Sequence, residues 1–443
     1  MKLFGTDGIR TRAGEFPLNA PAIVAIGQAV GEKLGGKLLV GEDTRISSPW
    51  ILKLLMQGMA RSSAQVESAG IIPTPGIALL TRSSSFAGGV MISASHNPYE
   101  DNGIKIFSHD GTKLTDEVEE QIERRILELL PQSADEETDT IPDADRFAER
   151  TEWIERYEEL LTSHFRDGSW LKGKRIVTDC ANGAMSVVAP ELLRRLGADV
   201  HVICASPNGK NINANCGAVH LEALESEMKV ANADFGVAFD GDGDRSLFVS
   251  RAGKRVDGDA VLLVMARQTK PSAIIGTSMT NYALEKKLES IGIGLTRVAV
   301  GDRYIFEEMQ RTGAPLGGEP SGHIIFSDFR LSGDGLLTTL KLAEVIVESG
   351  HSLDELTQDW IPAPQLLKGV RVAQKVPIEQ MDALKSAMHE ANSVLTGCGR
   401  LVVRYSGTEP LLRVMIESDD ANRNDVYMEK VIAAIHEDFK NRG

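Results

Sequence analysis

The chain contains the stretch Asp234-Phe-Gly-Val-Ala-Phe-Asp240-Gly-Asp242-Gly-Asp244-Arg245-Ser-Leu-Phe248, and its architecture can be worked out from there. An apolar run, typical of a buried strand, ends in three carboxylates at alternate positions with glycine between them. Because glycine permits a tight turn, Asp240, Asp242 and Asp244 are expected to converge on one hard cation. Oxygen ligands alone suit Mg²⁺ or Ca²⁺ rather than zinc.

This loop does not have the pattern of an EF-hand. That motif needs glycine after the third carboxylate and glutamate at the twelfth position, where this chain has Arg245 and Arg251. An arginine beside a carboxylate cluster suggests an anionic ligand that completes the metal shell. We therefore interpret the loop as a metal-assisted phosphate site; the alternative is an acidic surface turn.

A second constellation lies in Gly88-Gly-Val-Met-Ile-Ser-Ala-Ser95-His96-Asn97-Pro98. Asn-Pro favours turn initiation and keeps the preceding chain extended, so Ser95 is expected at a strand end with its hydroxyl facing a cleft. No G-x-S-x-G elbow surrounds it, which argues against a serine hydrolase. A hydroxyl that only caps the turn is the alternative.

Lys105 lies between Ile104 and Ile106 in an alternating, strand-like segment. Burial among apolar neighbours would lower the pKa of its amine. On this reasoning Lys105 is a candidate proton acceptor.

A third constellation is Arg404-Tyr-Ser406-Gly407-Thr408-Glu-Pro-Leu-Leu-Arg413. Two arginines flank a loop with two hydroxyls and a glycine whose backbone N–H can approach a ligand. These are the parts of a phosphate-binding nest. An ordinary Ser-Gly turn is the alternative.

The stretch Gly317-Gly-Glu319-Pro-Ser321-Gly-His323 combines a carboxylate, a hydroxyl and an imidazole within five positions. Such mixed groups fit the hydroxyls of a sugar. A loop histidine with its hydrogen bonds satisfied is an equally common reading.

Composition limits the possible functions. With 443 residues, 42% hydrophobic and 25% charged, the chain is expected to form several globular domains. Its formal net charge of −15 argues against a nucleic-acid partner. An acidic protein that binds sugar phosphates must gather its cations locally, and the candidates are Arg10, Arg45, Lys105, Arg245, Arg404 and Arg413.

The four cysteines show no C-x-x-C or Cys/His spacing, so neither a zinc site nor a disulfide framework is expected. The N-terminus has no apolar signal core, and no window resembles a membrane span. We therefore expect a cytoplasmic protein without a membrane partner.

Strands and helices are expected to alternate, which indicates α/β layers. Asn19 and Pro21 should begin a helix that ends at Gly35-Gly36, before a buried strand at 37–40. After an acidic linker at 131–145 come a helix at 146–165, strands at 175–179 and 199–203, and a helix at 186–196. A further unit has a helix at 257–268 and strands at 273–277 and 297–300. From Leu366 the pattern becomes β-α-β-β-α, with Met428, Val431, Ile435 and Phe439 along one stripe of the last helix.

Taken in order along the whole chain, these motifs resemble the α-D-phosphohexomutase superfamily, and most of all its phosphoglucosamine mutase branch. The motifs that carry the resemblance are Phe4-Gly-Thr-Asp7-Gly-Ile-Arg10, Ser95-His96-Asn97-Pro98, Asp179-Cys-Ala-Asn182-Gly-Ala, Pro207-Asn-Gly-Lys-Asn-Ile-Asn-Ala-Asn-Cys216-Gly, the Asp240 loop, Gly301-Asp302-Arg303-Tyr304, the Glu319 loop and the Arg404 loop.

The resemblance implies an α/β fold of three related α/β domains with mixed sheets plus a smaller C-terminal α+β domain, around a central cleft. The expected domains are 1–147 with the phosphoserine loop, 148–249 with the metal loop, 250–364 with the sugar loop and 365–443 with the phosphate loop. A homodimer is compatible with it.

It also implies an isomerase that interconverts glucosamine 6-phosphate and glucosamine 1-phosphate, feeding UDP-N-acetylglucosamine and cell-wall synthesis. A phosphoserine at Ser95 and a glucosamine 1,6-bisphosphate intermediate would carry the phosphoryl group, and one Mg²⁺ would be bound by Ser95, Asp240, Asp242 and Asp244. The implied catalytic residues are Ser95, His96, Lys105, Arg10 and Arg245, and the implied substrate-binding residues are Glu319, Ser321, His323, Arg404, Ser406, Gly407, Thr408 and Arg413.

Three alternatives stay open from the sequence. The first is a phosphoglucomutase or phosphomannomutase of the same superfamily. The second is a metal-dependent sugar phosphatase that uses Ser95, and the third is a non-catalytic sugar-phosphate binder.

Overall fold

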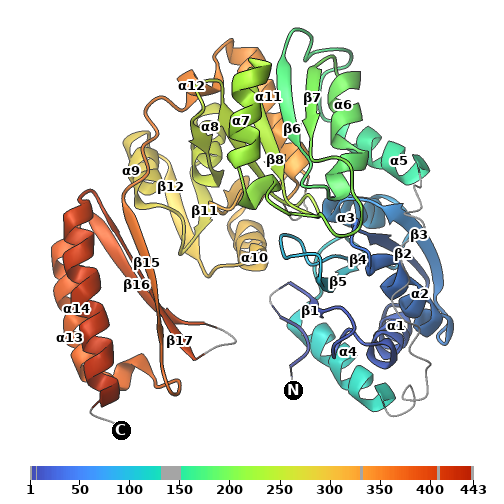
Figure 1. Ribbon diagram of the computed structural model, residues 1–443, viewed down its shortest axis with the longest axis horizontal. Helices are drawn as coiled ribbons and strands as arrows, with labels where there is room; N and C mark the ends of the chain where they lie inside the picture. The colour runs from blue at the N-terminus through green and yellow to red at the C-terminus, as the bar shows by residue number, and fades with distance from the viewer. Residues whose placement is uncertain (1, 6, 131–150, 330–332, 407–409, 441–443) are drawn as a thin grey trace.

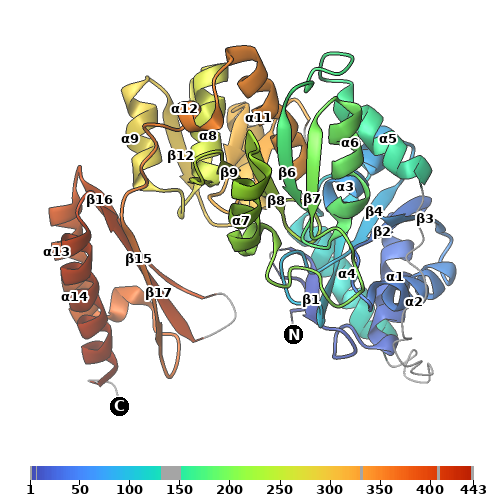
Figure 2. The ribbon, with the colours of Figure 1, turned by 45° about the horizontal axis from the view of Figure 1, so that its top comes forward.

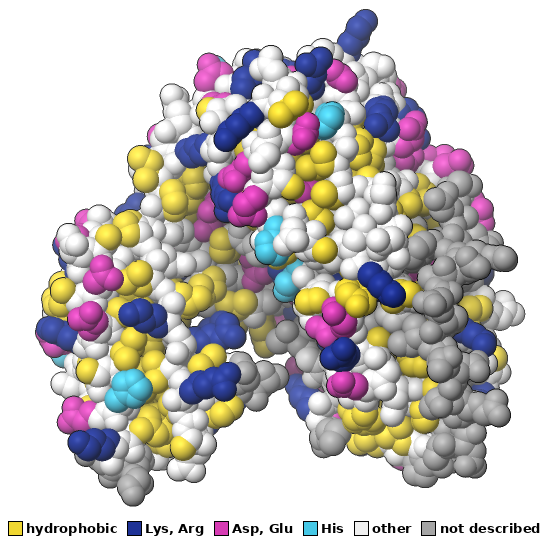
Figure 3. Space-filling model, viewed as in Figure 1, with side chains coloured by type: hydrophobic (Ala, Val, Ile, Leu, Met, Phe, Trp, Pro, Cys, Tyr) yellow, Lys and Arg dark blue, Asp and Glu magenta, His cyan; other side chains and the backbone are white. Residues whose placement is uncertain are grey.

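The computed structural model describes residues 2–5, 7–130, 151–329, 333–406 and 410–440 (Figure 1). Within these residues the strands form four sheets that follow one another along the chain. Figure 1 shows the four sheet-containing units along an arc, so that the first and the last face each other. Figure 3 shows that the molecule is hollowed between these two units.

The first domain has a mixed sheet in the order β1-β5-β4-β2-β3. Strands β2, β3 and β4 are parallel, whereas β5 runs antiparallel to β4 and to β1. The Asn19 side chain accepts a hydrogen bond from Ala22 N at 3.3 Å, which confirms the expected helix start. The elements are β1 (Ile9–Arg12), α1 (Ala20–Leu34), β2 (Lys37–Glu42), α2 (Ser48–Ala60), β3 (Gln65–Ile71), α3 (Thr74–Ser83), β4 (Gly88–Ile92), β5 (Asp101–Ser108) and α4 (Asp116–Leu129).

Helices α1 and α2 of this domain cross at two glycines. A Cβ atom on Gly27 would lie 2.3 Å from the Leu55 carbonyl oxygen, and one on Gly58 would lie 2.1 Å from that of Val24. The two backbones therefore touch, and only glycine allows this approach.

The second domain has a sheet in the order β10-β9-β8-β6-β7. The helix expected at 186–196 is interrupted: a 3-10 turn over Ala184–Val187 precedes α6, because Pro190 fits only the first turn of a helix. The sheet extends to Val256, past the boundary expected at 249. The elements are α5 (Thr151–Thr162), β6 (Arg175–Asp179), α6 (Ala189–Arg195), β7 (Asp199–Ile203), α7 (Glu222–Ala231), β8 (Phe235–Phe239), β9 (Ser246–Ser250) and β10 (Arg255–Val256).

The third domain has a four-stranded sheet in the order β12-β11-β13-β14. Asp257 caps α8 by accepting from Ala260 N at 2.9 Å, so the helix begins one residue later than expected. The elements are α8 (Gly258–Thr269), β11 (Ala273–Thr277), α9 (Tyr282–Ser290), β12 (Gly294–Val298), α10 (Asp302–Thr312), β13 (Leu316–Gly318), β14 (Ile324–Phe326), α11 (Gly335–Ser349) and α12 (Leu353–Leu356).

The C-terminal domain follows the expected β-α-β-β-α order. Its antiparallel sheet has the order β15-β17-β16, and α13 and α14 lie side by side against one face of it in Figures 1 and 2. Met428, Val431 and Ile435 of α14 are buried in its core, with Phe439 half-buried beside them. The elements are β15 (Gln365–Arg371), α13 (Asp382–Leu395), β16 (Gly399–Tyr405), β17 (Leu411–Ser418) and α14 (Ala421–Lys440).

The first three domains share a hydrophobic core, whereas the C-terminal domain has its own. One cluster of buried side chains contains Ile77 of the first domain, Phe235 of the second and Leu340 of the third. Polar contacts join the third domain to the fourth: Asn281 donates to the Glu417 carboxylate at 3.3 Å, and Arg400 to the Thr280 carbonyl at 2.6 Å. No helix in the described part of the chain has both the length and the apolar character that a membrane span needs.

Replacing Gly27 with alanine should lower the free energy of unfolding by about 1–2 kcal/mol, after subtraction of the roughly 1 kcal/mol that alanine gains in helix propensity. The added methyl group must push α1 away from α2 at Leu55. Urea denaturation measures the difference. Gln57→Ala, on the exposed side of α2, is the control and should change the free energy by less than about 0.5 kcal/mol. A Gly27→Ala variant as stable as the wild type would contradict the close backbone contact.

Candidate active site

Three carboxylates converge at the end of β8, as the sequence predicts. Oxygen atoms of Asp240, Asp242 and Asp244 lie within 4.8 Å of one another, and all three side chains are buried. The glycines between them are required. Gly243 has φ +74°, and a Cβ atom on Gly241 would lie 2.5 Å from the Ser95 carbonyl oxygen.

The donor atoms of this loop fit a divalent cation. Among the residues that the structure describes, neither Asp242 Oδ1 nor Asp244 Oδ1 has a hydrogen-bond partner, although both atoms are buried. Burial, together with the charges of Asp244 and Asp242, raises the pKa of the Asp240 carboxyl well above its usual range. A hard cation among these oxygens would relieve both the repulsion and the unpaired acceptors.

Ser95 reaches the carboxylates from the first domain. Its backbone is left-handed with φ 55°, and its hydroxyl donates to Asp240 Oδ2 at 2.6 Å. The amide of Ser95 donates to Ser93 Oγ at 2.9 Å, which stabilises this unusual conformation. The hydroxyl therefore lies at the carboxylate cluster, on the opposite side of a domain boundary.

The loop after Ser95 folds around the guanidinium of Arg45. This side chain is 0% exposed and forms an ion pair with Asp43 at 2.9 Å. Its remaining donors point at the backbone carbonyls of Ser95 and Asn97, both at 2.9 Å, of Asp101 at 3.0 Å, and of Pro98. The expectation that Arg45 serves the substrate pocket is therefore wrong, because its donors are already used to hold the loop.

Lys105, on β5, lies in this cluster as a cation. Its Nζ is 2.7 Å from Asp242 Oδ2, 3.0 Å from Asp7 and 3.4 Å from Asp244. Burial alone would lower the pKa of its amine, but the nearby carboxylates outweigh that effect and raise it. The sequence-based expectation of a lowered pKa is therefore wrong.

His96 has the opposite character. Its Nδ1 lies 3.3 Å from Ser95 Oγ, and burial together with the charges of Arg245 and Arg10 lowers its pKa to about 4. The imidazole is therefore neutral at neutral pH. Unlike Lys105, His96 therefore places an uncharged ring nitrogen beside the Ser95 hydroxyl.

The two arginines near His96, Arg10 and Arg245, each contact an aspartate. Arg10 pairs with Asp7 and donates to the Ala94 carbonyl at 3.3 Å. The amide of Arg245 donates to Asp240 Oδ1 at 3.1 Å, and its guanidinium lies 3.7 Å from Asp244.

The predicted sugar loop lies in the turn between β13 and β14. Glu319 accepts from the Gly301 amide at 3.1 Å and from Ser321 Oγ at 3.4 Å. The ring of His323 is buried, with Nε2 accepting from the Gly333 amide at 2.8 Å and Nδ1 3.8 Å from Asp244. These contacts bring the sugar loop next to the carboxylate cluster.

The predicted phosphate loop lies on the C-terminal domain. Arg404 and Arg413 occupy facing positions on β16 and β17 and line a cavity together with Met279 of the third domain. Ser406 is buried, and its carbonyl accepts from Lys375 at 2.8 Å. Gly407 and Thr408 lie outside the described residues. The two arginines therefore belong to the unit that faces the first domain across the hollow in Figure 3.

Other residues of the site were not predicted. Thr74 donates to Asp242 at 2.5 Å, and Lys113 bridges Asp7 and Asp302 at 2.5 and 2.7 Å. Nothing in their local sequence indicates a role, because each partner is remote along the chain.

Asn213 was also not predicted, although it lies in the quoted Pro207–Cys216 motif. Its amide nitrogen Nδ2 donates to the Ser95 carbonyl at 2.9 Å and to that of Asn97 at 3.1 Å. The second domain thus supports the Ser95 loop directly.

Comparison with known families covers almost the whole chain. Models of the phosphoglucomutase/phosphomannomutase family match in order: alpha/beta/alpha domain I at 1–132, domain II at 152–253, domain III at 257–363 and the C-terminal domain at 367–434.

Curated relatives are similar over their full length. A phosphoglucosamine mutase of Solibacter usitatus is 44% identical over 99% of both chains. Another, from Deinococcus radiodurans, is 41% identical and covers 100% of this chain and 98% of the relative.

Solved structures share the fold. A phosphoglucomutase/phosphomannomutase family protein of Burkholderia thailandensis has a TM-score of 0.82 at 23% identity, covering 99% of this chain and 97% of the other. The N-acetylphosphoglucosamine mutase of Aspergillus fumigatus, solved with GlcNAc-6P and magnesium, has a TM-score of 0.62 at 17% identity, covering 99% and 96%. With the carboxylate loop, the Ser95 turn and the full-length relatives together, this chain belongs to the phosphoglucomutase/phosphomannomutase family and, within it, to the phosphoglucosamine mutases, which are metal-dependent isomerases.

Proposed function

We propose that this enzyme interconverts glucosamine 6-phosphate and glucosamine 1-phosphate with Ser95 as the phosphoryl carrier. The observation that carries the proposal is the 2.6 Å contact between the Ser95 hydroxyl and Asp240, inside a buried group of three carboxylates. The choice of an amino sugar is supported by the names of the relatives, which are phosphoglucosamine mutases.

The reaction proceeds in two transfers. The O1 hydroxyl of glucosamine 6-phosphate attacks the phosphorus of phosphoserine 95; the phosphorus–Oγ bond breaks, Ser95 Oγ gains the proton that O1 loses, and glucosamine 1,6-bisphosphate forms. The bisphosphate then turns over in the cleft. Ser95 Oγ attacks the 6-phosphoryl group, the bond to O6 breaks, O6 gains the proton that the serine loses, and glucosamine 1-phosphate leaves.

Asp240, Asp242, Asp244 and Ser95 are the residues that would hold one Mg²⁺. When bound, the cation neutralises negative charge on the transferring oxygens. Lys105 and Arg245 add positive charge from the protein beside these acids. Neutral His96, 3.3 Å from Ser95 Oγ, takes the serine proton during the return transfer.

The remaining predicted residues bind the parts of the substrate that do not react. We assign the sugar hydroxyls and amine to Glu319, Ser321 and His323, and the second phosphate to the loop formed by Arg404, Ser406, Gly407, Thr408 and Arg413. Because one pocket serves both orientations of the bisphosphate, these contacts must suit features that the two orientations share. Arg10, near the Ser95 loop, is assigned to the transferring phosphoryl group.

Ser95→Ala should abolish mutase activity while the fold persists, because the phosphoryl acceptor is lost. Intact mass of the wild type should show a population heavier by one phosphoryl group, and peptide mapping should place it on Ser95. Ser85→Ala, on the exposed surface of the same domain, should keep full activity. Turnover by wild-type protein that never carries phosphate at Ser95, even with bisphosphate supplied, would refute the proposal.

Asp242→Asn removes one charge with little change in volume. We expect kcat to fall about a hundred- to thousandfold, the usual effect of losing one electrostatic contact to the transferring group. The matched control is Asp199→Asn, which changes an exposed acid at the start of β7. Full wild-type activity in excess chelator would contradict a metal-dependent role for this loop.

Competition among the 6-phosphates of glucosamine, glucose and mannose tests the substrate. The kcat/KM for glucosamine 6-phosphate should be the largest by more than about tenfold, since the charged C2 amine allows discrimination beyond shape. If another hexose phosphate is preferred, the amino-sugar assignment fails while the Ser95 chemistry stands. Inorganic phosphate formed as fast as isomerised product would indicate a phosphatase instead.

A further inference from the structure

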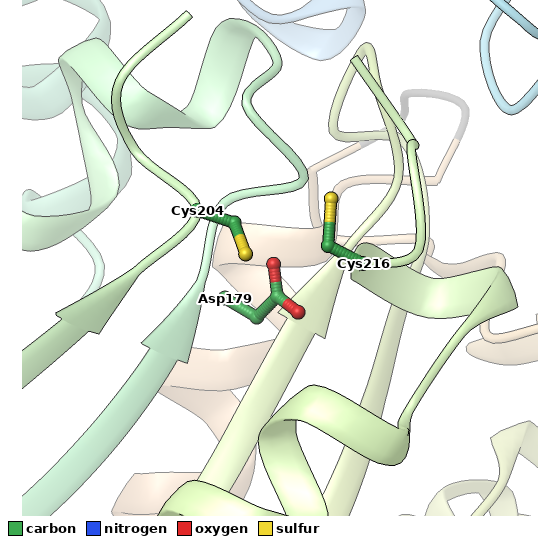
Figure 4. A group of neighbouring side chains, drawn as sticks. All are labelled: Asp179, Cys204 and Cys216. Atoms are coloured by element: carbon green, nitrogen blue, oxygen red, sulfur yellow. The ribbon is translucent and has the colours of Figure 1, made fainter. Parts of the chain in front are cut away.

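A second group of ligand atoms lies in the second domain, outside the reacting groups. Asp179 ends β6, Cys204 follows β7, and Cys216 precedes a short 3-10 turn. One ligand atom of each lies within 4.8 Å of the others. Figure 4 shows the Asp179 carboxylate between the two cysteine side chains.

The surroundings orient these three side chains. The Asp179 oxygens accept from the amides of Ala181 and Gly217, both at 2.9 Å. The side-chain amide of Asn182 donates to Cys216 Sγ at 3.7 Å. Hydrogen bonds of this kind to ligating carboxylates and thiolates are typical of the residues around a metal site.

The backbone around the group is strained. Ala181, Asn182 and Cys204 have φ values of 52°, 47° and 50°, in the left-handed region that residues with a Cβ atom rarely adopt. Such conformations persist where the surrounding structure enforces them, and they gather at functional sites. Here they turn the Cys204 side chain back toward β6.

We propose that Asp179, Cys204 and Cys216 bind one soft divalent cation, with Zn²⁺ as the clearest case. Two thiolates and a carboxylate suit Zn²⁺, whereas the oxygen-only loop at Asp240 suits Mg²⁺. Each thiol loses its proton when the cation binds. Asp179 and Cys216 are buried but Cys204 is partly exposed, so the group reaches the surface on the Cys204 side.

A cation at this position would stiffen the support of the Ser95 loop. Cys216 lies three residues after Asn213, whose backbone amide donates to the Ala181 carbonyl at 2.9 Å. The side chain of Asn213 donates to the Ser95 carbonyl at 2.9 Å. Binding therefore ties the segment that carries Asn213 to the end of β6.

Titration of the reduced, full-length protein with Co²⁺ in a large excess of Mg²⁺ tests the site. Mg²⁺ occupies the oxygen loop, and only thiolate ligands give sulfur-to-cobalt charge-transfer absorption. We expect this band to saturate at one Co²⁺ per chain and to disappear when Zn²⁺ is added. Cys398→Ser, which removes a thiol in the C-terminal domain, should keep the band. The C204S/C216S double variant should lose it.

Absence of the band in the wild type, or its persistence in C204S/C216S, would overturn the proposal. A second contradicting result has two parts: protein purified without reductant contains a Cys204–Cys216 disulfide, and the same protein after reduction binds no cation. If the double variant misfolds, alkylation of the thiols in the wild-type protein tests the same site without any substitution. Zn²⁺ should protect Cys204 from alkylation and leave Cys398 reactive; equal labelling of Cys204 with and without Zn²⁺ would also count against the site.

Discussion

The buried guanidinium of Arg45 is the contact on which the rest of the site depends. It is removed from solvent, and its charge is balanced by Asp43. Its donors meet the carbonyls of four residues in the Ser95 loop, two of which also accept from Asn213 of the second domain. Replacing a buried charge partner of this kind leaves the Asp43 carboxylate without its counter-charge in the interior. Together with Ser93 and Asn213, this contact holds the left-handed backbone of Ser95, and hence the direction of its hydroxyl.

Neighbouring charges then set the pKa values of Lys105 and His96 in the site. Asp242 and Asp244 come from the second domain, while Lys105 and Asp7 come from the first. The carboxylates around Lys105 outweigh its burial and raise the pKa of its amine, which favours the charged form. Burial and the charges of Arg245 and Arg10 lower the pKa of His96 instead, which favours its neutral form. Burial lowers the pKa of both side chains; the carboxylates around Lys105 outweigh that effect, whereas the arginines near His96 add to it.

The sequence could predict what depends on neighbours along the chain. The Gly-Asp alternation predicted the convergence of the three carboxylates, and the β-α-β-β-α pattern predicted the C-terminal domain. The pKa of Lys105 was predicted wrongly because its partners Asp7 and Asp242 are remote in sequence. Cys204 and Cys216 come together without any recognisable spacing, so their grouping with Asp179 could be seen only in the folded chain.

The division of the site between two domains has a consequence for damaged molecules. Asn213 and Asp240 approach the Ser95 loop from the second domain, and the first three domains share a hydrophobic core. A molecule whose domains separate therefore loses its carboxylates and its substrate site together. Hydrolysis of a phosphate monoester is among the slowest uncatalysed reactions known. With Ser95 as the phosphoryl carrier, an enzyme molecule whose domains have separated is therefore inactive but keeps its phosphoryl group. It does not hydrolyse further sugar phosphates. Because the site is divided between domains, domain separation ends phosphoryl transfer without starting phosphate hydrolysis.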